Sequence, residues 1–302
     1  MKKLLRKMAD KSLVVRNTLS NKISKPTLVL MYHRINDENI DNSVYTVSSK
    51  NFRDQIRYLK EAFTIVRFEE DWDAFDKPNV VITFDDGYYD NYDVALKILE
   101  QEDVTATFFI TTGNLDSKKL FWWDELALHI EVIKEHSGLS VPELHLLLKN
   151  KNINEQEEFF TKYRSYYGAI DEDTAEYYRF LTSKELYDFS QNRLITIGAH
   201  TINHPKLSIL DKEEIMHELK GSQEVLEAII KKEVTVVAYP FGGYMDYNKD
   251  VIEVCKKIGF KKAATTVECN NYSWTQQMKI PRYQIEDDTL DVFKDKIQSV
   301  LG

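Results

Sequence analysis

Short apolar runs alternate with helical patterns along most of this 302-residue chain, and no other feature constrains its fold as strongly. The runs are rich in β-branched and aromatic residues, which is typical of buried strands. They lie at 27–31, 64–68, 80–84, 105–110, 194–199, 234–239, 260–265 and 279–285. Helical patterns separate most of them, at 49–62, 91–102, 183–192, 211–231, 248–258 and 289–301. This alternation predicts an α/β fold with a parallel sheet covered by helices, and the number of units favours a barrel over an open sheet.

The stretch at about 120–180 breaks this alternation. It is helical in pattern, charged and rich in Tyr and Phe, and it separates two of the predicted strands. A plain connection between strands needs far fewer residues. We therefore expect a helical insertion beside the functional edge of the sheet. Two interpretations stay open: the insertion shapes substrate choice, or it is a scaffold without substrate contact.

The first 25 residues differ in charge from the rest of the chain. They hold eight Lys or Arg and one acid, whereas the whole chain has a net charge of −9. Charged residues interrupt the apolar stretches of this arm, so it lacks the continuous apolar core of a signal peptide. We expect a retained basic arm at 1–25, a barrel domain at 26–302 and a cytoplasmic protein.

The arm also carries a weak apolar stripe at helical spacing. Such a helix would make peripheral contact with the anionic inner face of a membrane, and the alternative is a solvated N-terminal helix. No apolar stretch approaches the roughly 18 residues that a membrane-spanning helix needs. Two cysteines are too few for a disulfide framework, and an acidic body without a basic stripe argues against nucleic-acid binding.

Acidic and imidazole side chains follow two of the predicted strands directly. Asp85 and Asp86 come after the run at 80–84, and His200 and His204 after the run at 194–199. If both strands are parallel members of one sheet, these side chains emerge at the same edge. Two imidazoles and one carboxylate suit a catalytic zinc ion with an open position, and the second carboxylate is then free to act as a base. The histidine spacing fits either one face of a helix or two corners of a tight loop.

Three motifs give the chain a resemblance to polysaccharide deacetylases of the NodB-homology type, carbohydrate esterase family 4. Residues 83–87 match the T-F-D-D-G motif, and 200–204 match H-[ST]-x-x-H. Residues 239–242 resemble the third motif, R-x-P-[FY]-G. The matches span about 28–285. The resemblance implies a distorted (β/α)7-type barrel, a divalent metal and hydrolysis of N-acetyl groups on sugars.

The resemblance also implies roles for individual residues. Asp85 is the expected general base. Asp86, His200 and His204 are the expected metal ligands, with Zn²⁺ the expected metal and Co²⁺, Ni²⁺ or Mn²⁺ as alternatives. The backbone N–H of Phe241 is expected to bind the oxyanion.

Two aromatic residues complete the expected substrate contacts. Tyr239 belongs to the third motif and is expected at the substrate with Phe241. Of the adjacent pair Trp122 and Trp123, one is expected in the core and the other, Trp123, stacked on a sugar ring.

The chain departs from the family pattern in two places. Ala238 stands where the third motif has an arginine, and Arg282 is the candidate substitute; the alternative is that Arg282 pairs with a surface acid. The late histidine motif is missing, and His33, directly after the first predicted strand, is the candidate general acid. That early position resembles the poly-N-acetylglucosamine deacetylase branch. The alternative is a histidine that caps the strand by hydrogen bonding.

The predicted function is metal-dependent removal of N-acetyl groups from amino sugars of a polysaccharide, oligosaccharide or lipid-linked glycan. Two alternatives stay open. The first is a deformylase or amidase that acts on a lipid-linked amino sugar. The second is a carbohydrate-binding barrel that kept its metal site and lost catalysis, which the two departures from the family pattern motivate.

Overall fold

The computed structural model describes residues 20–21, 24–38, 40, 43–72 and 78–301. The predicted basic arm at 1–25, with its proposed membrane contact, lies almost entirely outside these residues. Among the helices that are described, none has both the length and the apolar character needed to cross a bilayer.

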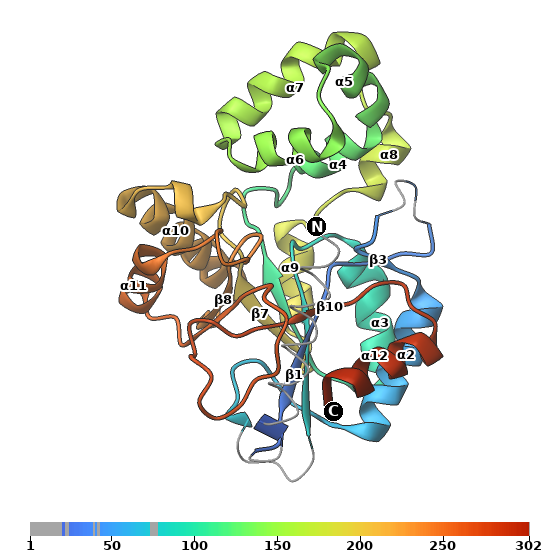
Figure 1. Ribbon diagram of the computed structural model, residues 1–302, viewed down its shortest axis with the longest axis vertical. Coiled ribbons are helices and arrows are strands. Elements are labelled where there is room, and N and C mark those ends of the chain that lie inside the picture. The colour runs from blue at the N-terminus through green and yellow to red at the C-terminus, as the bar shows by residue number, and fades with distance from the viewer. Residues whose placement is uncertain (1–19, 22–23, 39, 41–42, 73–77, 302) are drawn as a thin grey trace.

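The main sheet consists of parallel strands in the order β10-β1-β5-β6-β7-β8-β9, with β4 added beside β5 (Figure 1). The strands are β1 (Thr27–Tyr32), β4 (Thr64–Ile65), β5 (Asn79–Phe84), β6 (Ala106–Ile110), β7 (Ile195–Ala199), β8 (Val236–Ala238), β9 (Lys262–Ala264) and β10 (Tyr283–Gln284). All of their pairings are parallel, and β1 pairs with β5 over the full length of both strands. The predicted parallel sheet is confirmed, although several strands are shorter than the apolar runs that contain them.

The sheet curls until its two edges meet at one segment. Ile280 forms a parallel bridge with Ala264 of β9, and Tyr283 pairs with Leu30 of β1. The segment at 280–284 therefore touches both edge strands. This arrangement confirms the predicted distorted (β/α)7-type barrel.

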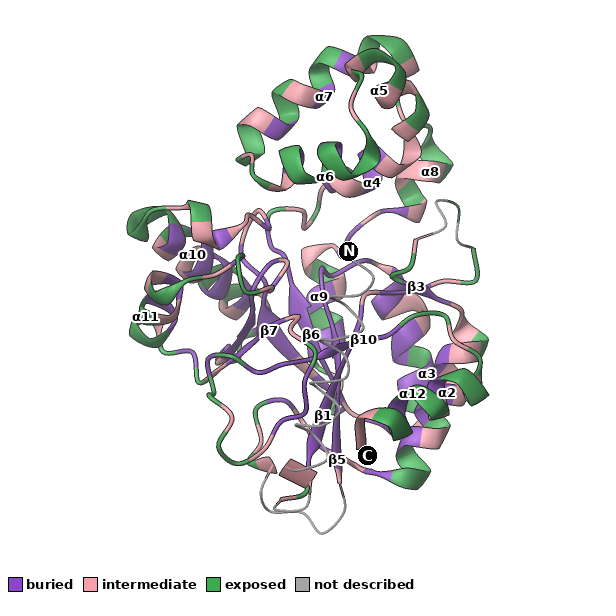
Figure 2. Ribbon diagram, in the orientation of Figure 1, coloured by how far each residue is buried: buried purple, intermediate pink, exposed green. Residues whose placement is uncertain are grey.

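Successive residues of each strand face opposite sides of the curled sheet. Leu28 and Leu30 of β1 pack in a large outer core beneath the helices, whereas Val29 packs in a smaller inner core. The inner core also contains Val81 of β5 and Phe109 of β6. Because both faces are covered, β1 and β5 are buried along their whole length, as Figure 2 shows.

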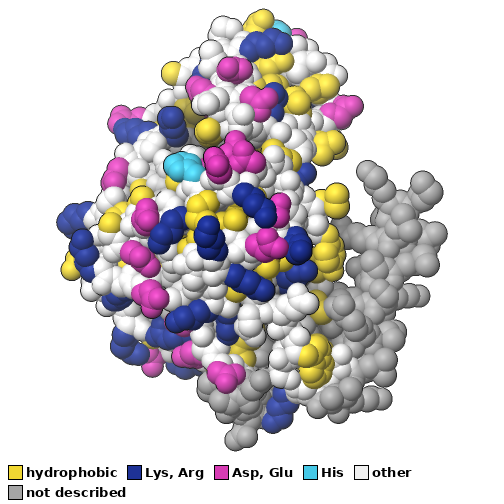
Figure 3. Space-filling view, turned by 90° about the vertical axis from the view of Figure 1, so that its left-hand side faces the viewer, with side chains coloured by type: hydrophobic (Ala, Val, Ile, Leu, Met, Phe, Trp, Pro, Cys, Tyr) yellow, Lys and Arg dark blue, Asp and Glu magenta, His cyan; other side chains and the backbone are white. Residues whose placement is uncertain are grey.

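The helices that cover the sheet lie where the sequence predicts them. They are α2 (Ser49–Ala62), α3 (Leu96–Glu102), α9 (Ser183–Ser190), α10 (Lys212–Ile230), α11 (Lys249–Ile258) and α12 (Leu290–Leu301), with single turns η2 (Asn91–Ala95) and η3 (Leu207–Ile209). Side-chain caps set several starts: Ser48 accepts from the backbone N–H of Asn51, and Asp211 forms a capping box with Glu214. Acidic and basic side chains are interspersed on the face that Figure 3 shows, which is typical of solvated helices.

The predicted insertion stands above the carboxyl edge of the sheet (Figure 1). It contains α4 (Trp122–Leu128), α5 (Ile130–Ser137), α6 (Val141–Lys149), α7 (Ile153–Tyr167) and α8 (Glu172–Tyr177). Helices α4 to α7 share a small core, made by Trp122, Leu126, Ile133, Leu144, Leu148, Phe160 and Tyr163. The insertion is therefore a packed helical unit.

A short two-stranded sheet was not predicted. It pairs β2 (Arg34–Ile35) with β3 (Thr46–Val47) directly after β1. Buried Arg34 forms an ion pair with Asp90 at 2.8 Å and donates to the backbone oxygen of Tyr177 at 2.6 Å. Because Tyr177 ends α8, this arginine connects the barrel to the insertion.

Candidate metal and catalytic site

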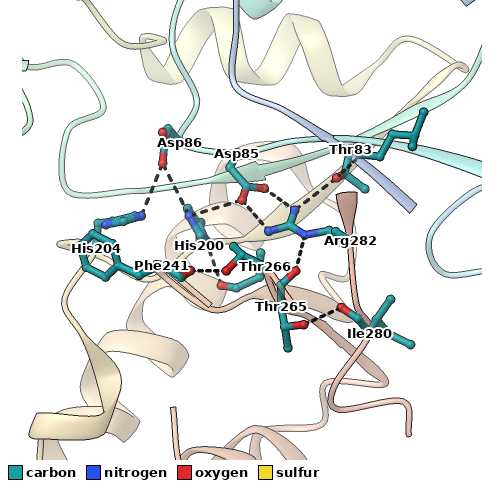
Figure 4. Close-up of polar contacts among 12 residues, drawn as sticks. Thr83, Asp85, Asp86, His200, His204, Phe241, Thr265, Thr266, Ile280 and Arg282 are labelled. Carbon is teal, nitrogen blue, oxygen red and sulfur yellow. Dashed lines mark hydrogen bonds and ion pairs between the residues drawn. The ribbon is translucent and has the colours of Figure 1, made fainter. Parts of the chain in front are cut away.

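The predicted functional residues gather at the carboxyl edge of the parallel sheet (Figure 4). Asp85 and Asp86 follow β5, and His200 follows β7. His33 follows β1, and Arg282 directly precedes β10. Parallel strands present their carboxyl ends at one edge, so residues far apart in the sequence meet there.

Asp86, His200 and His204 form a buried cluster. One carboxylate oxygen of Asp86 lies 3.6 Å from His200 Nε2 and 3.5 Å from His204 Nε2. One ligand atom from each of the three residues lies within 4.8 Å of the others. Two imidazoles and one carboxylate at these distances are a donor set suited to a divalent metal ion.

Unusual backbone conformations orient the side chains of this cluster. Asp86 has a φ of 78°, Thr201 of 66° and His204 of 54°, all in the left-handed region that non-glycine residues seldom occupy. His200–His204 is therefore a tight loop, which settles the choice between loop and helix. Buried Glu218 of α10 fixes this loop, because it accepts hydrogen bonds from the backbone N–H groups of Ile202 and Asn203. Strained conformations held by surrounding contacts are frequent at functional sites.

The electrostatics of the cluster fit a bound cation. Burial, followed by the nearby Asp85 and Asp124 carboxylates, raises the pKa of Asp86 well above its usual value. Burial, followed by the neighbouring His200, lowers the pKa of His204. His200 Nδ1–H donates to the backbone oxygen of Ala238 at 2.9 Å, which leaves Nε2 with its lone pair toward Asp86. Neutral imidazoles oriented by a second hydrogen bond are the form that ligates metals, and a divalent cation would offset the buried carboxylate.

Arg282 clamps Asp85. Its guanidinium donates to both carboxylate oxygens, at 2.7 and 2.6 Å, and to the backbone oxygen of Thr265 at 2.9 Å. Arg282 is fully buried. Burial raises the pKa of Asp85, but the Arg282 guanidinium, with His200 and His33, outweighs this effect, and the pKa falls to about 2. The structure thus places Arg282 against the predicted base, where the motif arginine is replaced by Ala238, and not against a surface acid.

His33 lines the same cavity as these carboxylates. Its ring lies 4.8 Å from the Tyr45 ring, and its Nδ1 is buried without a hydrogen-bond partner among the described residues. Burial lowers the pKa of His33 to about 4; Asp85 opposes this effect, while Arg282 and His200 reinforce it. His33 is therefore neutral near pH 7 in the substrate-free protein.

Both the barrel and the insertion line this cavity, which has a volume of about 670 Å³. The insertion contributes Trp122, Trp123, Asp124, Ala127, His145, Leu146 and Lys149. The insertion therefore faces the site directly, and the interpretation as a remote scaffold does not hold for α4 and α6.

Trp123 lies beside the metal cluster. Its ring packs edge-on against His204 at 4.7 Å, and its indole N–H donates to the hydroxyl of Tyr88 at 3.1 Å. Tyr88 in turn donates to the buried carboxylate of Asp124 at 2.7 Å. Trp122 is more deeply buried but also lines the cavity, so the pair is not divided cleanly between core and site.

The side chain of Tyr239 does not reach the cavity, which corrects its expected place at the substrate. It is fully buried, its hydroxyl donates to the backbone oxygen of Met278 at 3.1 Å, and its ring stacks on Tyr247. The cause is strand alternation: Ala238 faces the inner core, so Tyr239 faces the outer core beneath the helices. Phe241, two residues further, does line the cavity.

Sequence reasoning missed several cavity residues: Tyr45, Tyr88, Asp124, His145 and Lys149. Tyr45 directly precedes the unpredicted strand β3. His145 and Lys149 lie on α6, whose sequence resembles any amphipathic helix. Asp124 directly follows the tryptophan pair, which was the only local signal for this group.

Comparisons with known proteins agree with this geometry. The family model for polysaccharide deacetylase matches residues 73–263. The putative polysaccharide deacetylase YxkH of Bacillus subtilis is 23% identical over 79% of this chain, and the match spans 63% of that relative's own length. The poly-beta-1,6-N-acetyl-D-glucosamine N-deacetylase of Staphylococcus aureus is 25% identical over 87% of this chain and 80% of its own.

The solved structures show the same fold. The deacetylase PplD of Streptococcus pyogenes, in complex with acetate, superposes with a TM-score of 0.64 at 19% identity, over 92% of this chain and 99% of that one. The structure of IcaB from Ammonifex degensii superposes with a TM-score of 0.62 at 16% identity, over 92% of this chain and 98% of its own. The family model spans more than half of the chain, and the residues that it covers include the clustered carboxylates and histidines. This chain therefore belongs to the polysaccharide deacetylase family of carbohydrate-acting hydrolases.

Proposed function

We propose that this protein is a metal-dependent N-deacetylase that removes acetyl groups from N-acetylglucosamine units of a glycan. The observation that carries the proposal is the buried cluster of Asp86, His200 and His204 beside the arginine-clamped Asp85, within one cavity. The similarity to a poly-beta-1,6-N-acetyl-D-glucosamine N-deacetylase supports this substrate class.

Asp86, His200 and His204 would hold the divalent cation. A donor set of two imidazoles and one carboxylate suits Zn²⁺, with Co²⁺, Ni²⁺ and Mn²⁺ as other candidates. When bound, such a cation supplies Lewis-acid chemistry and lowers the pKa of water toward about 7.

Asp85 acts as the general base. Its two hydrogen bonds to Arg282 fix the carboxylate orientation and keep it ionised at neutral pH. A carboxylate with a low pKa is a weak base toward bulk water. Its function as a proton acceptor therefore depends on its place beside the cluster, 4.0 Å from His200 Nε2, where a bound cation would lower the pKa of the attacking water.

Phe241 and His33 serve the later steps. The backbone N–H of Phe241 donates to the oxyanion that forms on the acetyl carbonyl, an interaction worth about 3 kcal/mol per well-placed donor. His33 passes to the leaving amine nitrogen the proton that Asp85 has taken from the attacking water. Because His33 is neutral before substrate binds, it accepts this proton only during the reaction, when negative charge that develops on the acetyl oxygen raises the pKa of the imidazole.

The insertion and β3 provide the surfaces for the sugar. Trp123 and Tyr45 offer aromatic rings at the cavity, and Asp124 and Gln284 offer polar groups. Aromatic faces with a few polar groups are a usual way to bind and orient a sugar ring.

A direct assay tests the proposal. Protein stripped with a chelator and reloaded with Zn²⁺ is incubated with β-1,6-linked N-acetylglucosamine oligomers, and both acetate and free amine are measured. We expect equal amounts of the two products from the reloaded protein and none from the stripped protein. Metal-independent release, or no release with any N-acetylated oligomer, would refute the proposal. An N-formylated oligomer run in parallel tests the deformylase alternative.

A further inference from the structure

One lysine of the insertion contacts the loop that carries the proposed oxyanion donor. Lys149 ends α6, and its ammonium lies 2.8 Å from an Asp246 carboxylate oxygen and 4.6 Å from the centre of the Phe241 ring. The Asp246 side chain is buried and that of Lys149 is 30% exposed, so this contact is partly shielded from solvent.

The contacted loop is strained. Phe241 has a φ of 60°, a conformation that a phenylalanine rarely adopts, and Gly242 also has a φ of 60°. A Cβ at Gly242 would lie 2.7 Å from the backbone nitrogen of Thr266. The loop thus has a narrow set of allowed conformations, and the contacts around it must select the one observed.

On the barrel side, two residues hold the loop. Thr266 donates through its hydroxyl to the Phe241 backbone oxygen at 2.5 Å and through its N–H to the Gly242 oxygen at 3.1 Å. Asp246 accepts from the N–H of Gly243 at 3.0 Å. Asp246 therefore binds the loop with one carboxylate oxygen and Lys149 with the other.

On the insertion side, Lys149 holds both Asp246 and the ring of Phe241. That ring also packs against His204 at 4.8 Å, so a shift of the Phe241 loop would disturb the metal cluster as well. Lys149 is thus placed to fix the direction of the Phe241 N–H without contacting the reacting atoms itself.

We propose that Lys149 is a positioning residue that keeps the Phe241 loop in its strained, donor-presenting conformation, which makes the insertion a working part of the catalytic site. The inference rests on the proposed function, because it takes the Phe241 N–H as the oxyanion donor. Lys149 acts on the transition state and not on substrate binding, since the oxyanion forms only as the reaction proceeds.

Three variants distinguish a role of Lys149 in positioning the Phe241 loop from a role in merely attaching the insertion to the barrel. Lys149→Met keeps the aliphatic stem and removes the charge, and Lys149→Arg restores a cation. Lys206→Met is the matched control, because Lys206 donates to Asn150, next to Lys149 in the sequence, and also links the insertion to the barrel. Each variant is loaded with Zn²⁺, and its metal content, kcat and KM are measured.

We expect Lys149→Met to lower kcat by about tenfold, with KM changed less than about twofold and metal content unchanged. Lys149→Arg should recover most of kcat, and Lys206→Met should stay near the parent protein. An unchanged kcat for Lys149→Met would overturn the proposal. A rise in KM with kcat retained would also overturn it, because Lys149 would then be a substrate contact.

Hydrogen exchange of the peptide at 239–247 gives a readout that needs no activity. Loss of the Lys149 contact should speed exchange in this peptide and leave β5 and β7 unaffected. If Lys149→Met does not fold, Asp246→Asn replaces it, since an amide oxygen can still accept from Gly243 while the ion pair is lost. If the parent protein deacetylates nothing, the proposed function fails, whereas exchange still shows whether Lys149 holds the loop. If the peptide at 239–247 exchanges at the same rate in the parent protein and in the folded variant, Lys149 does not hold the loop.

Discussion

The barrel edge and the helical insertion form opposite walls of one cavity, yet they build their halves differently. The barrel presents Asp85, Asp86 and His200 directly after buried strands, and the backbone has a positive φ at Asp86 and, just beyond His200, at Thr201 and His204. The insertion presents Trp123 and Lys149 from ordinary helices that rest on a small separate core. The groups with proposed chemical roles are held by the sheet, whereas the groups on the facing wall are held by helices that pack on a different core. We expect barrel substitutions to change kcat and insertion substitutions to change mainly KM, with Lys149 as the exception.

The largest expected effect comes from removal of the proposed base. Asp85→Asn should lower kcat by on the order of 10²–10⁴-fold, because general base catalysis is lost. The metal content should be unchanged, since Asp86, His200 and His204 are intact. Steady-state kinetics and elemental analysis of the same sample check both expectations. If Asp85→Asn is active, Asp85 is not the general base, and the proposed division between a catalytic barrel wall and a substrate-binding insertion wall fails.

The second prediction concerns the buried ion pair. Arg282→Met leaves the Asp85 carboxylate buried without its partner, and breaking such a pair is expected to destabilise the protein by about 3–5 kcal/mol. Urea unfolding of the metal-free protein measures the change. The double variant Arg282→Met/Asp85→Asn provides the comparison, because it also removes the buried carboxylate charge that Arg282→Met leaves without a partner. If the urea midpoint of Arg282→Met equals that of the parent protein, the ion pair between Arg282 and Asp85 does not stabilise this edge of the barrel.

The third prediction concerns the insertion wall. Trp123→Leu should raise KM for N-acetylglucosamine oligomers by about three- to tenfold, because loss of an aromatic contact costs about 0.5–1.5 kcal/mol. The effect on kcat should be smaller than the effect on KM. Leu146→Ala on α6 is a milder control at the same wall, since Leu146 is largely exposed. A loss in kcat alone for Trp123→Leu would show that its packing on His204, and not sugar contact, is its main role.

The smallest expected effect concerns the cysteines of the barrel. Cys255 and Cys269 are both buried and are not joined in a disulfide, and burial raises the pKa of the Cys255 thiol to about 12. Neither should react measurably with a thiol reagent at pH 8 in the folded protein, and both should react in denaturant. Rapid labelling of folded protein would show that the barrel opens more readily than its packed core suggests.

Local patterns in the sequence were sufficient for most of the fold. The helix at 49–62 was predicted to the residue, and α10 and α11 to within one residue at each end, because amphipathic spacing and capping residues are local signals. Strand ends were less certain: the run at 234–239 contains only Val236–Ala238 as strand. Pairing with neighbours limits a strand, and apolar character continues beyond the pairing.

The sequence by itself determined that Asp85, Asp86, His200 and His204 lie close together, since acids and histidines that directly follow strands share one edge once those strands are parallel. It also offered Arg282 as the candidate substitute for the arginine missing at Ala238, and the structure places Arg282 against Asp85. Only the tertiary structure decided that Tyr239 faces the helices, that α4 and α6 line the cavity, and that Lys149 contacts Phe241. The physical reason is that some of these contacts join segments far apart in the chain, and others depend on which face of a strand turns inward. Neither kind of contact produces a periodic pattern in the local sequence.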